Sequence, residues 1–253
     1  MEERINSLVV KDLEIHYQKN QILHEVNLEL EKGKIHLLVG PNGSGKTTLL
    51  NALSGTVDFS GTIHLEGKPQ KQLSRKELAQ TVSMVHSVNA VHHILVREFI
   101  EMSRFPYTHF LGKLNSEDQK IINQSVELVG ISELLNRSLQ NLSDGERKKV
   151  MITAALIQDC PIMLMDEPTT FLDIGNKYQF SKLIRKIKIE LGKTVLISSH
   201  DLDLVFQIAD SILLIQDKQI QQYSLQEVKA QKLIEKVFGS YDVKLDENGR
   251  LQL

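Results

Sequence analysis

The chain has 253 residues, with 30 Lys plus Arg against 32 Asp plus Glu, a formal net charge of −2 and one cysteine. This length suits one globular domain with a substantial core, and the near-neutral charge gives no overall footprint for nucleic acid. No apolar run approaches the ~18 residues that span a bilayer, and the N-terminus lacks the basic and apolar regions of a signal peptide. We therefore do not expect an integral membrane protein, and the lone Cys160, which cannot form an intrachain disulfide, favours a reducing compartment.

Short β-branched or aliphatic runs recur along the chain, separated by helical patterns. The predicted strands are Leu8–Val10, Ile35–Val39, Thr62–Leu65, Val82–Val85, Ile162–Met165, Val195–Ser198 and Ser211–Ile215. Several are continuously apolar, which is typical of central strands covered on both faces, and their alternation with helices predicts an α/β fold with a mostly parallel sheet. In the first third, strand-like segments follow one another through short turns, which predicts an antiparallel subdomain. After Ser224 we expect only a terminal helix and a short strand.

The segment from about Arg97 to Leu156 is mainly helical in pattern. Ser116 precedes acidic residues and is expected to cap a helix that ends near Gly130. Ser143 likewise precedes a helix that runs to about Gln158. Because the chain shows no repeat and no linker, this helical part is interpreted as an insertion in one domain.

The most specific motif lies between the strand Ile35–Val39 and a helix over Thr48–Leu53. It fits the pattern G-x-x-x-x-G-K-[ST] and consists of Gly40, Pro41, Asn42, Gly43, Ser44, Gly45, Lys46 and Thr47, with Thr48 adjoining. Its glycines let backbone N–H groups approach phosphate oxygens, and the helix adds its positive N-terminal end. Lys46 supplies a charge for the β- and γ-phosphates, and the Thr47 hydroxyl can coordinate Mg²⁺. The motif predicts a nucleoside triphosphate site, without separating kinase, GTPase, helicase and transport ATPase.

A second acidic element ends the apolar run Ile162–Met165. Asp166 stands at the carboxyl end of this strand, where α/β sheets place their ligands, and its carboxylate can hold the Mg²⁺ shell. Glu167 is placed to polarise a water for in-line attack on the γ-phosphate. A strand that simply ends at a polar turn before Pro168 is the plainer alternative. The presence of the Gly40–Thr47 loop in the same chain favours the functional interpretation.

With these elements in place, the sequence resembles the ATP-binding cassette (ABC) ATPases over nearly the whole chain, in the family's order. The further segments that carry the resemblance are Leu142-Ser143-Asp144-Gly145-Glu146 for the signature Leu-Ser-Gly-Gly-Gln, Thr170-Phe171-Leu172-Asp173 for the D-loop, Ser198-Ser199-His200-Asp201 for the switch histidine, and Tyr17 for the aromatic ring stacked on adenine. Each has a plainer alternative. Ser143 alone would be a helix cap, His200 a capping or buried histidine, and Tyr17 half-buried packing.

The resemblance implies a P-loop nucleoside triphosphatase with a RecA-like parallel core, an antiparallel β subdomain and a helical insertion subdomain. The single domain would span residues 1–253, with the core over 1–86 and 161–253 and the helical part over about 87–160. The resemblance also implies a homodimer that sandwiches two ATP molecules head to tail. Glu167 and His200 would be catalytic, and Lys46 and Glu167 would face Ser143 of the partner subunit across the nucleotide. Ser143, Gly145 and Asp173 would bind nucleotide.

Two departures from the family pattern stand out. Asp144 and Glu146 replace a glycine and a glutamine of the signature and add negative charge near a polyphosphate, which the basic run Arg147–Lys149 is placed to offset. The glutamine that usually ends the strand Val82–Val85, where the family contacts Mg²⁺ and relays the permease contact, falls here on His86 or Ser87. Ser87 would replace it only in part.

The branch of the family is indicated by one segment. Met102-Ser103-Arg104-Phe105-Pro106-Tyr107, then Leu111-Gly112-Lys113-Leu114 and Ser116-Glu117-Asp118, resembles the importer ATPases for ferric siderophores, haem and cobalamin. The plainer alternative is a proline-containing surface loop before a helix. The resemblance implies a polytopic membrane permease as partner, a substrate-binding protein as an indirect one, no nucleic acid, and a place on the cytoplasmic face of a membrane.

Other functions remain open at this stage. The chain could serve another transport branch, such as a multidrug exporter or a manganese or zinc importer, or a cassette protein of assembly, repair or translation. A small-molecule kinase would leave the signature and His200 unexplained. His86, His92 and His93 are interpreted as ordinary loop histidines rather than a metal site, because adjacent histidines face different ways on a strand or helix.

Overall fold

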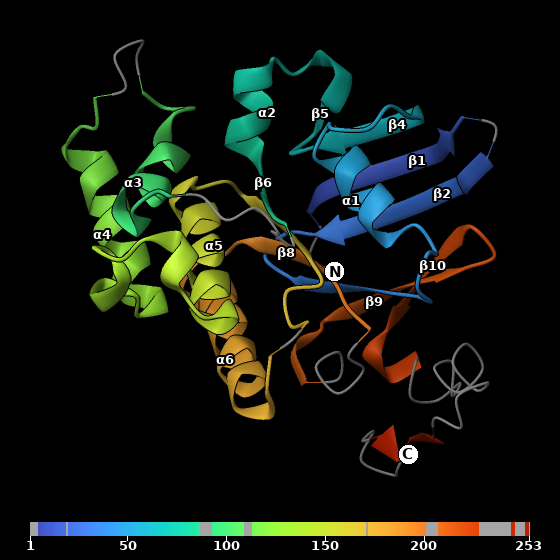
Figure 1. Cartoon of the computed structure of the whole chain (residues 1–253). Helices are drawn as coiled ribbons and strands as arrows, with labels where there is room; N and C mark the ends of the chain where they lie inside the picture. Colours follow the sequence, from blue (N-terminus) through green and yellow to red (C-terminus); the bar gives the residue numbers. More distant parts are fainter. Residues whose placement is uncertain are drawn as a thin grey trace.

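The computed structural model of the protein describes residues 5–18, 20–86, 93–108, 113–170, 172–200, 207–227, 244–245 and 251–252. This part contains a six-stranded sheet, a four-stranded sheet and a layer of helices (Figure 1). A ribbon of two short strands, β11 (Lys244–Leu245) and β12 (Leu251–Gln252), pairs near the C-terminus, where we expected one strand. Residues 225–227 are helical, and the rest of the expected terminal helix lies outside the described residues. No helix in the described ranges is long and apolar enough to cross a membrane.

The larger sheet has the strand order β10-β9-β3-β8-β7-β6. Its strands are β3 (Ile35–Val39), β6 (Val82–Val85), β7 (Ile162–Asp166), β8 (Thr194–Ser198), β9 (Ser211–Gln216) and β10 (Gln219–Ser224). All neighbours pair in parallel except β10, which forms an antiparallel hairpin with β9. Every residue of β3, β7 and β8 is buried, and this accounts for the continuous apolar runs in the sequence. The predicted parallel core is confirmed.

The smaller sheet is antiparallel and has the order β2-β1-β4-β5, as the first third of the sequence predicted. Its strands are β1 (Asn6–Tyr17), β2 (Asn20–Glu31), β4 (Ser60–Leu65) and β5 (Lys68–Pro69). Sequence reasoning missed β2 because its alternation is interrupted between the buried Leu23 and Val26, where Glu25 has a φ of 47°. The pairing of β1 with β2 contains several register shifts, as expected where bulges break the period of two.

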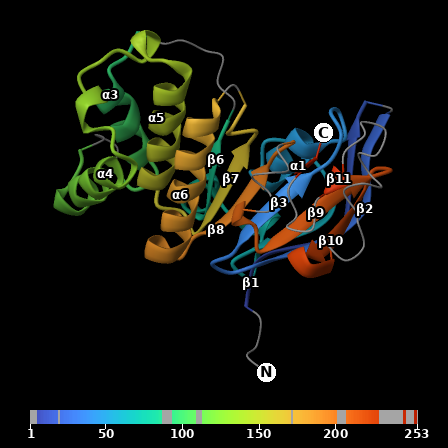
Figure 2. The same cartoon turned by 90° about the horizontal axis from the view of Figure 1, so that it is seen from below.

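Three apolar clusters hold the sheets and helices together. The helices are α1 (Lys46–Leu53), α2 (Arg75–Thr81), α3 (Val96–Glu101), α4 (Ser116–Val129), α5 (Asp144–Ile157) and α6 (Ile174–Leu191), with 3-10 turns at Gln70–Gln72, Met102–Arg104, Ser132–Leu134 and Leu139–Asn141. Alternate residues of β3 divide between two clusters. Leu38 packs with α1 and the smaller sheet, whereas Leu37 and Val39 pack with α6. The third cluster joins α3, α4 and α5, which stand together away from α1 in Figures 1 and 2.

One helix start differs from expectation. Ser116 was expected to cap α4, but the N-cap is Asn115, and Ser116 is the first helical residue. Asn115 Oδ1 accepts hydrogen bonds from the backbone N–H groups of Glu117 and Asp118, at 2.8 and 2.9 Å, while Asp118 Oδ2 accepts from Asn115 N at 3.0 Å. This reciprocal capping box satisfies more of the free N–H groups of the first turn than a serine one residue later.

Candidate nucleotide-binding site

Residues 40–45 of the motif join β3 to α1 at the carboxyl end of the parallel sheet, and α1 begins at Lys46, two residues before the predicted start. Gly45 has a φ of 103°, a conformation that side-chain-bearing residues rarely adopt. A Cβ on Gly40 would lie 2.8 Å from Ser44 Oγ, so that position also requires glycine. Ser44 Oγ is itself buried and has no hydrogen-bond partner among the described residues. A tight loop with an unsatisfied hydroxyl group fits a phosphate, whose oxygens can accept from such donors.

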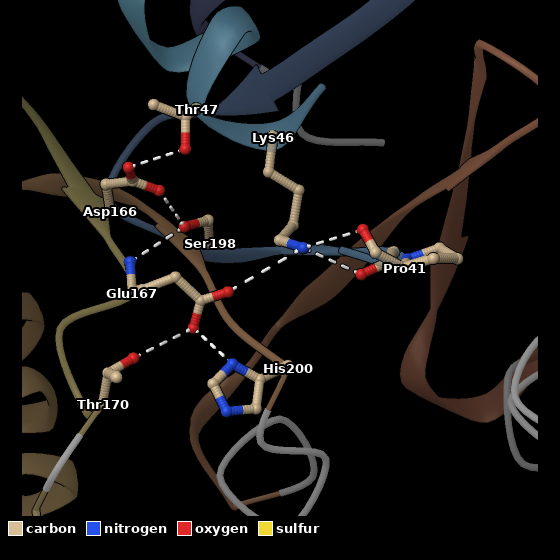
Figure 3. A network of polar contacts seen from close by, with 9 residues as sticks. Pro41, Lys46, Thr47, Asp166, Glu167, Thr170, Ser198 and His200 are labelled. Carbon is tan, nitrogen blue, oxygen red and sulfur yellow. Dashed lines mark hydrogen bonds and ion pairs between the residues drawn. The ribbon is translucent and has the colours of Figure 1, made fainter. Parts of the chain in front are cut away.

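Lys46 reaches back over this loop (Figure 3). Its Nζ donates hydrogen bonds to the carbonyl oxygens of Gly40 at 2.9 Å and Pro41 at 3.1 Å, and it lies 3.8 Å from Glu167 Oε1. The side chain is 8% exposed, so its ammonium group lies within the loop rather than in bulk solvent. A buried ammonium needs partners of this kind, and phosphate oxygens would be stronger ones than carbonyls.

The oxygen donors beside Lys46 suit a magnesium ion. Thr47 Oγ1 donates to Asp166 Oδ2 at 2.8 Å, and Ser198 Oγ donates to Asp166 Oδ1 at 2.6 Å. Magnesium is bound by hard oxygen ligands, commonly one or two protein groups together with substrate phosphates. No group of three or more His, Cys, Asp or Glu side chains that could hold a metal exists in the described part of the chain. The residues therefore fit a Mg²⁺ ion bound together with a nucleotide.

Glu167 is held in an unusual backbone conformation. Its φ is 46°, a left-handed value that costs roughly 1–2 kcal/mol in a residue with a side chain. Its N–H group donates to Ser198 Oγ at 2.9 Å and lies 3.2 Å from the Ser198 carbonyl oxygen, so strand β8 holds the turn in place. Ser198 thus contacts both acidic residues. Sequence reasoning placed it in the switch segment but assigned it no role, because no motif marks a serine two residues before the histidine.

His200 completes this network. Its Nδ1 lies 2.6 Å from Glu167 Oε2, to which Thr170 Oγ1 also donates at 3.4 Å (Figure 3). The ring is largely exposed, so the alternative of a buried histidine is wrong, while the alternative of a capping histidine concerns residues 201–206, which lie outside the described residues. The structure therefore brings together Lys46, Thr47 and Asp166 with Glu167 and His200, as the motifs indicated. Their individual roles in binding and catalysis remain predictions.

The signature segment lies at the start of α5. Ser143 is the N-cap of this helix, as predicted, and forms a capping box with Glu146. Gly145 is close to the first turn of α6, since a Cβ on it would lie 3.7 Å from Asn176 Nδ2. Asp173 caps α6 by accepting from Asn176 N at 2.7 Å and Asn176 Nδ2 at 3.0 Å. Asn176 therefore contacts Asp173 of the D-loop and lies near Gly145 of the signature, a proximity that the sequence did not indicate.

The two acidic replacements in the signature each have an arginine partner. Arg147 Nη1 donates to Asp144 Oδ1 at 3.1 Å, as the basic run suggested. Glu146, however, pairs with Arg137, whose Nη1 donates to Glu146 Oε1 at 2.7 Å. The expectation that Arg147–Lys149 offsets both acids was thus wrong for Glu146. Its partner comes from the turn before α5, where spacing along one helix gives no signal.

The structure describes three of the remaining candidate residues, and all three are exposed. Tyr17 ends β1 with 65% of its surface exposed, so the alternative of half-buried packing is wrong, while its contact with adenine remains a prediction. His86 is exposed directly after β6, and His93 is exposed before α3. Ser87 and His92 lie outside the described residues.

The segment that indicated the importer branch is built around a buried ion pair rather than a loose surface loop. Arg104 Nε donates to Asp118 Oδ1 at 2.8 Å, and its Nη1 donates to the Ile157 carbonyl at 3.0 Å. The guanidinium also lies 3.9 Å from the centre of the Tyr107 ring. Both charged side chains are 5% exposed or less. Through these hydrogen bonds, Arg104 links the 3-10 turn after α3 to the start of α4 and the end of α5.

Strand, loop, lysine and acidic strand end together define a P-loop nucleoside triphosphatase. Residues 23–170 match the family model described as ABC transporter. The chain is 35% identical over 201 residues to the iron(3+)-hydroxamate import ATP-binding protein FhuC of Bacillus subtilis (strain 168), with 79% of this chain and 75% of that protein covered. It is 32% identical over 235 residues to the petrobactin import ATP-binding protein FpuD of Bacillus anthracis, with 92% and 86% covered.

A solved dimeric structure of MJ0796, a bacterial ABC transporter cassette, superposes with a TM-score of 0.76 at 24% identity, with 86% of this chain and 98% of that one covered. This likeness concerns the fold. The family match and the two relatives show that the chain belongs to the ABC transporter family, as one of its ATPases.

Proposed function

We propose that this protein is the ATP-hydrolysing subunit of an importer for an iron chelate, acting through a separate membrane permease. The network that joins Lys46, Thr47 and Asp166 to Glu167 and His200 supports ATP hydrolysis. The relatives named for hydroxamate and petrobactin import support an iron chelate as cargo, with cobalamin as the neighbouring alternative.

In this proposal the chain's own groups bind and orient the nucleotide. Lys46 exchanges its carbonyl partners for β- and γ-phosphate oxygens, and the loop N–H groups bind the same phosphates. Thr47 and Asp166 hold Mg²⁺, which when bound neutralises charge that develops on the phosphates. The exposed Tyr17 ring is available to stack on adenine.

The chemistry is attack of water on the γ-phosphorus, with ADP as leaving group and phosphate as the second product. Glu167 accepts the proton of the attacking water as general base. The contact between His200 Nδ1 and Glu167 Oε2 orients this carboxylate, and the backbone bonds to Ser198 fix its approach. Geometric control of this kind is a large part of catalysis in phosphoryl transfer.

The second half of the site is proposed to come from another copy of the chain. Ser143 and Gly145 open α5, which stands with α3 and α4 away from α1 in both views (Figures 1 and 2). The N-terminus of α5 offers backbone N–H groups that suit a γ-phosphate. Head-to-tail pairing of two chains would bring these groups onto the ATP held by the other loop, and Asp173 would lie beside the same interface. The single-domain division into 1–86, about 87–160 and 161–253 is part of this proposal.

The permease is proposed to contact the segment around Arg104. Met102 is 46% exposed and Phe105 is 56% exposed, while Arg104 between them is fastened to α4 and α5. Two outward apolar side chains on a firmly anchored turn suit a partner surface that must transmit force. The substrate-binding protein would act through the permease.

Uptake in cells tests this proposal. A strain lacking the chain would be complemented with the wild type, Glu167→Gln or the exposed-site control Glu190→Gln, and supplied with ⁵⁵Fe-labelled ferric hydroxamate or labelled cobalamin. We expect ferric chelate uptake to require the chain, to fail with Glu167→Gln and to persist with Glu190→Gln. Loss of cobalamin uptake alone would assign the other cargo. Unchanged uptake of both compounds would contradict the importer assignment.

A further inference from the structure

The Ser143 hydroxyl group makes two hydrogen bonds with Glu146, one as donor and one as acceptor. Ser143 Oγ donates to Glu146 Oε2 at 2.9 Å and accepts from Glu146 N at 3.3 Å. The backbone N–H of Ser143 donates to the same carboxylate oxygen at 2.8 Å. The orientation of the serine hydroxyl is therefore set by where the Glu146 carboxylate lies. Whatever fixes that carboxylate also fixes the hydroxyl.

Arg137 fixes the carboxylate. Its Nη1 donates to Glu146 Oε1 at 2.7 Å, and its Nη2 donates to the carbonyl oxygen of Asn141 at 2.7 Å. The backbone of Arg137 is held as well, since its N–H donates to Leu134 O at 2.9 Å and its carbonyl accepts from Val96 N at 3.0 Å. A planar guanidinium group anchored at both ends gives the carboxylate one defined position.

The charge of Glu146 makes this anchor necessary. The N–H and hydroxyl of Ser143, and then Arg137, lower the pKa of Glu146 below its ordinary value, so the side chain is ionised at neutral pH. An unpaired carboxylate beside the signature serine would repel a polyphosphate. A glutamine at this position would offer the same acceptor oxygen without the charge.

We propose that Arg137 is a positioning residue for the signature serine: it holds and neutralises Glu146, so that Ser143 can meet the γ-phosphate bound by the partner subunit. This inference rests on the two-chain site of the proposed function. It predicts a specific dependence, in which Arg137 matters because residue 146 is a glutamate.

A double-mutant cycle tests this dependence. The four proteins are wild type, Arg137→Gln, Glu146→Gln and the double variant, measured for ATPase KM and kcat and, in a Glu167→Gln background, for ATP-dependent dimer formation. Arg137→Gln should raise KM and weaken dimer formation roughly 10-fold, with kcat at saturating ATP nearly unchanged. In the Glu146→Gln background the same substitution should change either quantity less than about 2-fold.

Two controls separate positioning from folding. Arg137→Lys keeps the charge beside Glu146 and should restore most of the ATP affinity, whereas Arg75→Gln, on an exposed residue of α2, should change nothing. Thermal unfolding of each variant shows whether it is folded. An equal loss from Arg137→Gln in both backgrounds, or no loss in either, would overturn the proposal.

A third variant distinguishes the two levels of the argument. If Ser143→Ala leaves ATP-dependent dimer formation and hydrolysis at wild-type levels, the two-chain site itself is wrong and the role of Arg137 falls with it. If Ser143→Ala impairs both while the cycle shows no coupling, only the positioning role fails.

Discussion

The proposed nucleotide site has a loop half around Gly40–Thr47 and a signature half around Ser143. The side chains of these two halves are held by different kinds of contact. At the loop Gly40–Thr47, which follows β3, side chains from the ends of β7 and β8 already meet. Within a single chain, Glu167 contacts His200, and both Asp166 and Glu167 contact side chains that follow strand β3. Asp166 is also hydrogen-bonded to the end of β8. Around the signature, Ser143 is bonded to its own helix, and its neighbouring acids are neutralised by local arginines.

If the proposed two-chain site is correct, this difference would let the enzyme limit its own activity. In the proposed site, the loop half would bind nucleotide and hold the base in place within one chain. The signature half keeps its serine and its charges satisfied until another surface presents a phosphate. Hydrolysis would then depend on assembly rather than on ATP binding alone, which suits an enzyme that must couple each turnover to a transport event.

The largest expected effect concerns the base of the loop half. Glu167→Gln removes the proton acceptor but keeps a side chain of similar size, so ATP binding and dimer formation should persist while kcat falls by roughly 10²–10⁴-fold. Phosphate release under saturating ATP measures this, with Glu190→Gln as a control that should retain wild-type turnover. Unimpaired turnover of Glu167→Gln would show that another group is the base.

The next effect should separate the helical layer from the loop half. Asp118→Asn leaves Arg104 buried without a counter-charge, which should destabilise the folded protein by about 3–5 kcal/mol in urea unfolding. Glu117→Gln, the exposed neighbour, should cost less than about 0.5 kcal/mol. At concentrations of urea where both proteins are folded, nucleotide affinity at the loop should be the same. A matching loss of affinity would show that the two regions are not independent.

The stability that the same ion pair contributes should also depend on pH. Burial acts to raise the pKa of Asp118, but the hydrogen bond from Asn115 N–H and the pair with Arg104 outweigh it and lower the pKa below its ordinary value. A lowered carboxylate pKa contributes stability that is present above the unfolded-state value, about 3.9, and is lost as pH falls through the folded-state value. The wild type should therefore lose this contribution below about pH 4, whereas Asp118→Asn should lack that part of the pH dependence.

A smaller effect tests whether Ser198 positions the acidic residues of the loop half. Ser198→Ala removes the hydroxyl that donates to Asp166 and accepts from Glu167 N. We expect kcat to fall about 10-fold while the affinity for nucleotide changes little, since the loop donors remain. Ser83→Ala is a matched control, because Ser83 is also a buried strand serine but its Oγ has no partner among the described residues. Equal activities of the two variants would remove the positioning role of Ser198.

The sequence predicted the loop half more completely than the signature half, for a physical reason. Residues such as Thr47 and Asp166 lie at fixed places relative to a strand end, so the ladder of parallel strands determines that they meet. The partners of the signature depend on turns instead. Arg137 lies in an irregular segment before α5, and no period relates its position to Glu146.

Local backbone detail was also beyond the sequence. The N-cap of α4 is Asn115 rather than the predicted Ser116, because Asp118 forms a reciprocal capping box with Asn115. The strand β2 was hidden by the positive φ of Glu25, which shifts the burial pattern by one residue. Ser198 carries a decisive pair of hydrogen bonds, but a serine in a strand has many ordinary explanations.

The central claim is that one ATP site is built from two chains, and cross-linking tests it most directly. Asn42 in the loop half and Asp144 in the signature half are both exposed, and the native Cys160 is buried with a pKa raised to about 12 by burial, so it will not compete for a maleimide. Chains carrying Glu167→Gln with either Asn42→Cys or Asp144→Cys would be mixed with ATP, Mg²⁺ and a short bis-maleimide. A covalent dimer that forms only in the mixture, and only with ATP, is the predicted result. No dimer in the mixture, with an internal cross-link in a chain carrying both cysteines, would contradict the account.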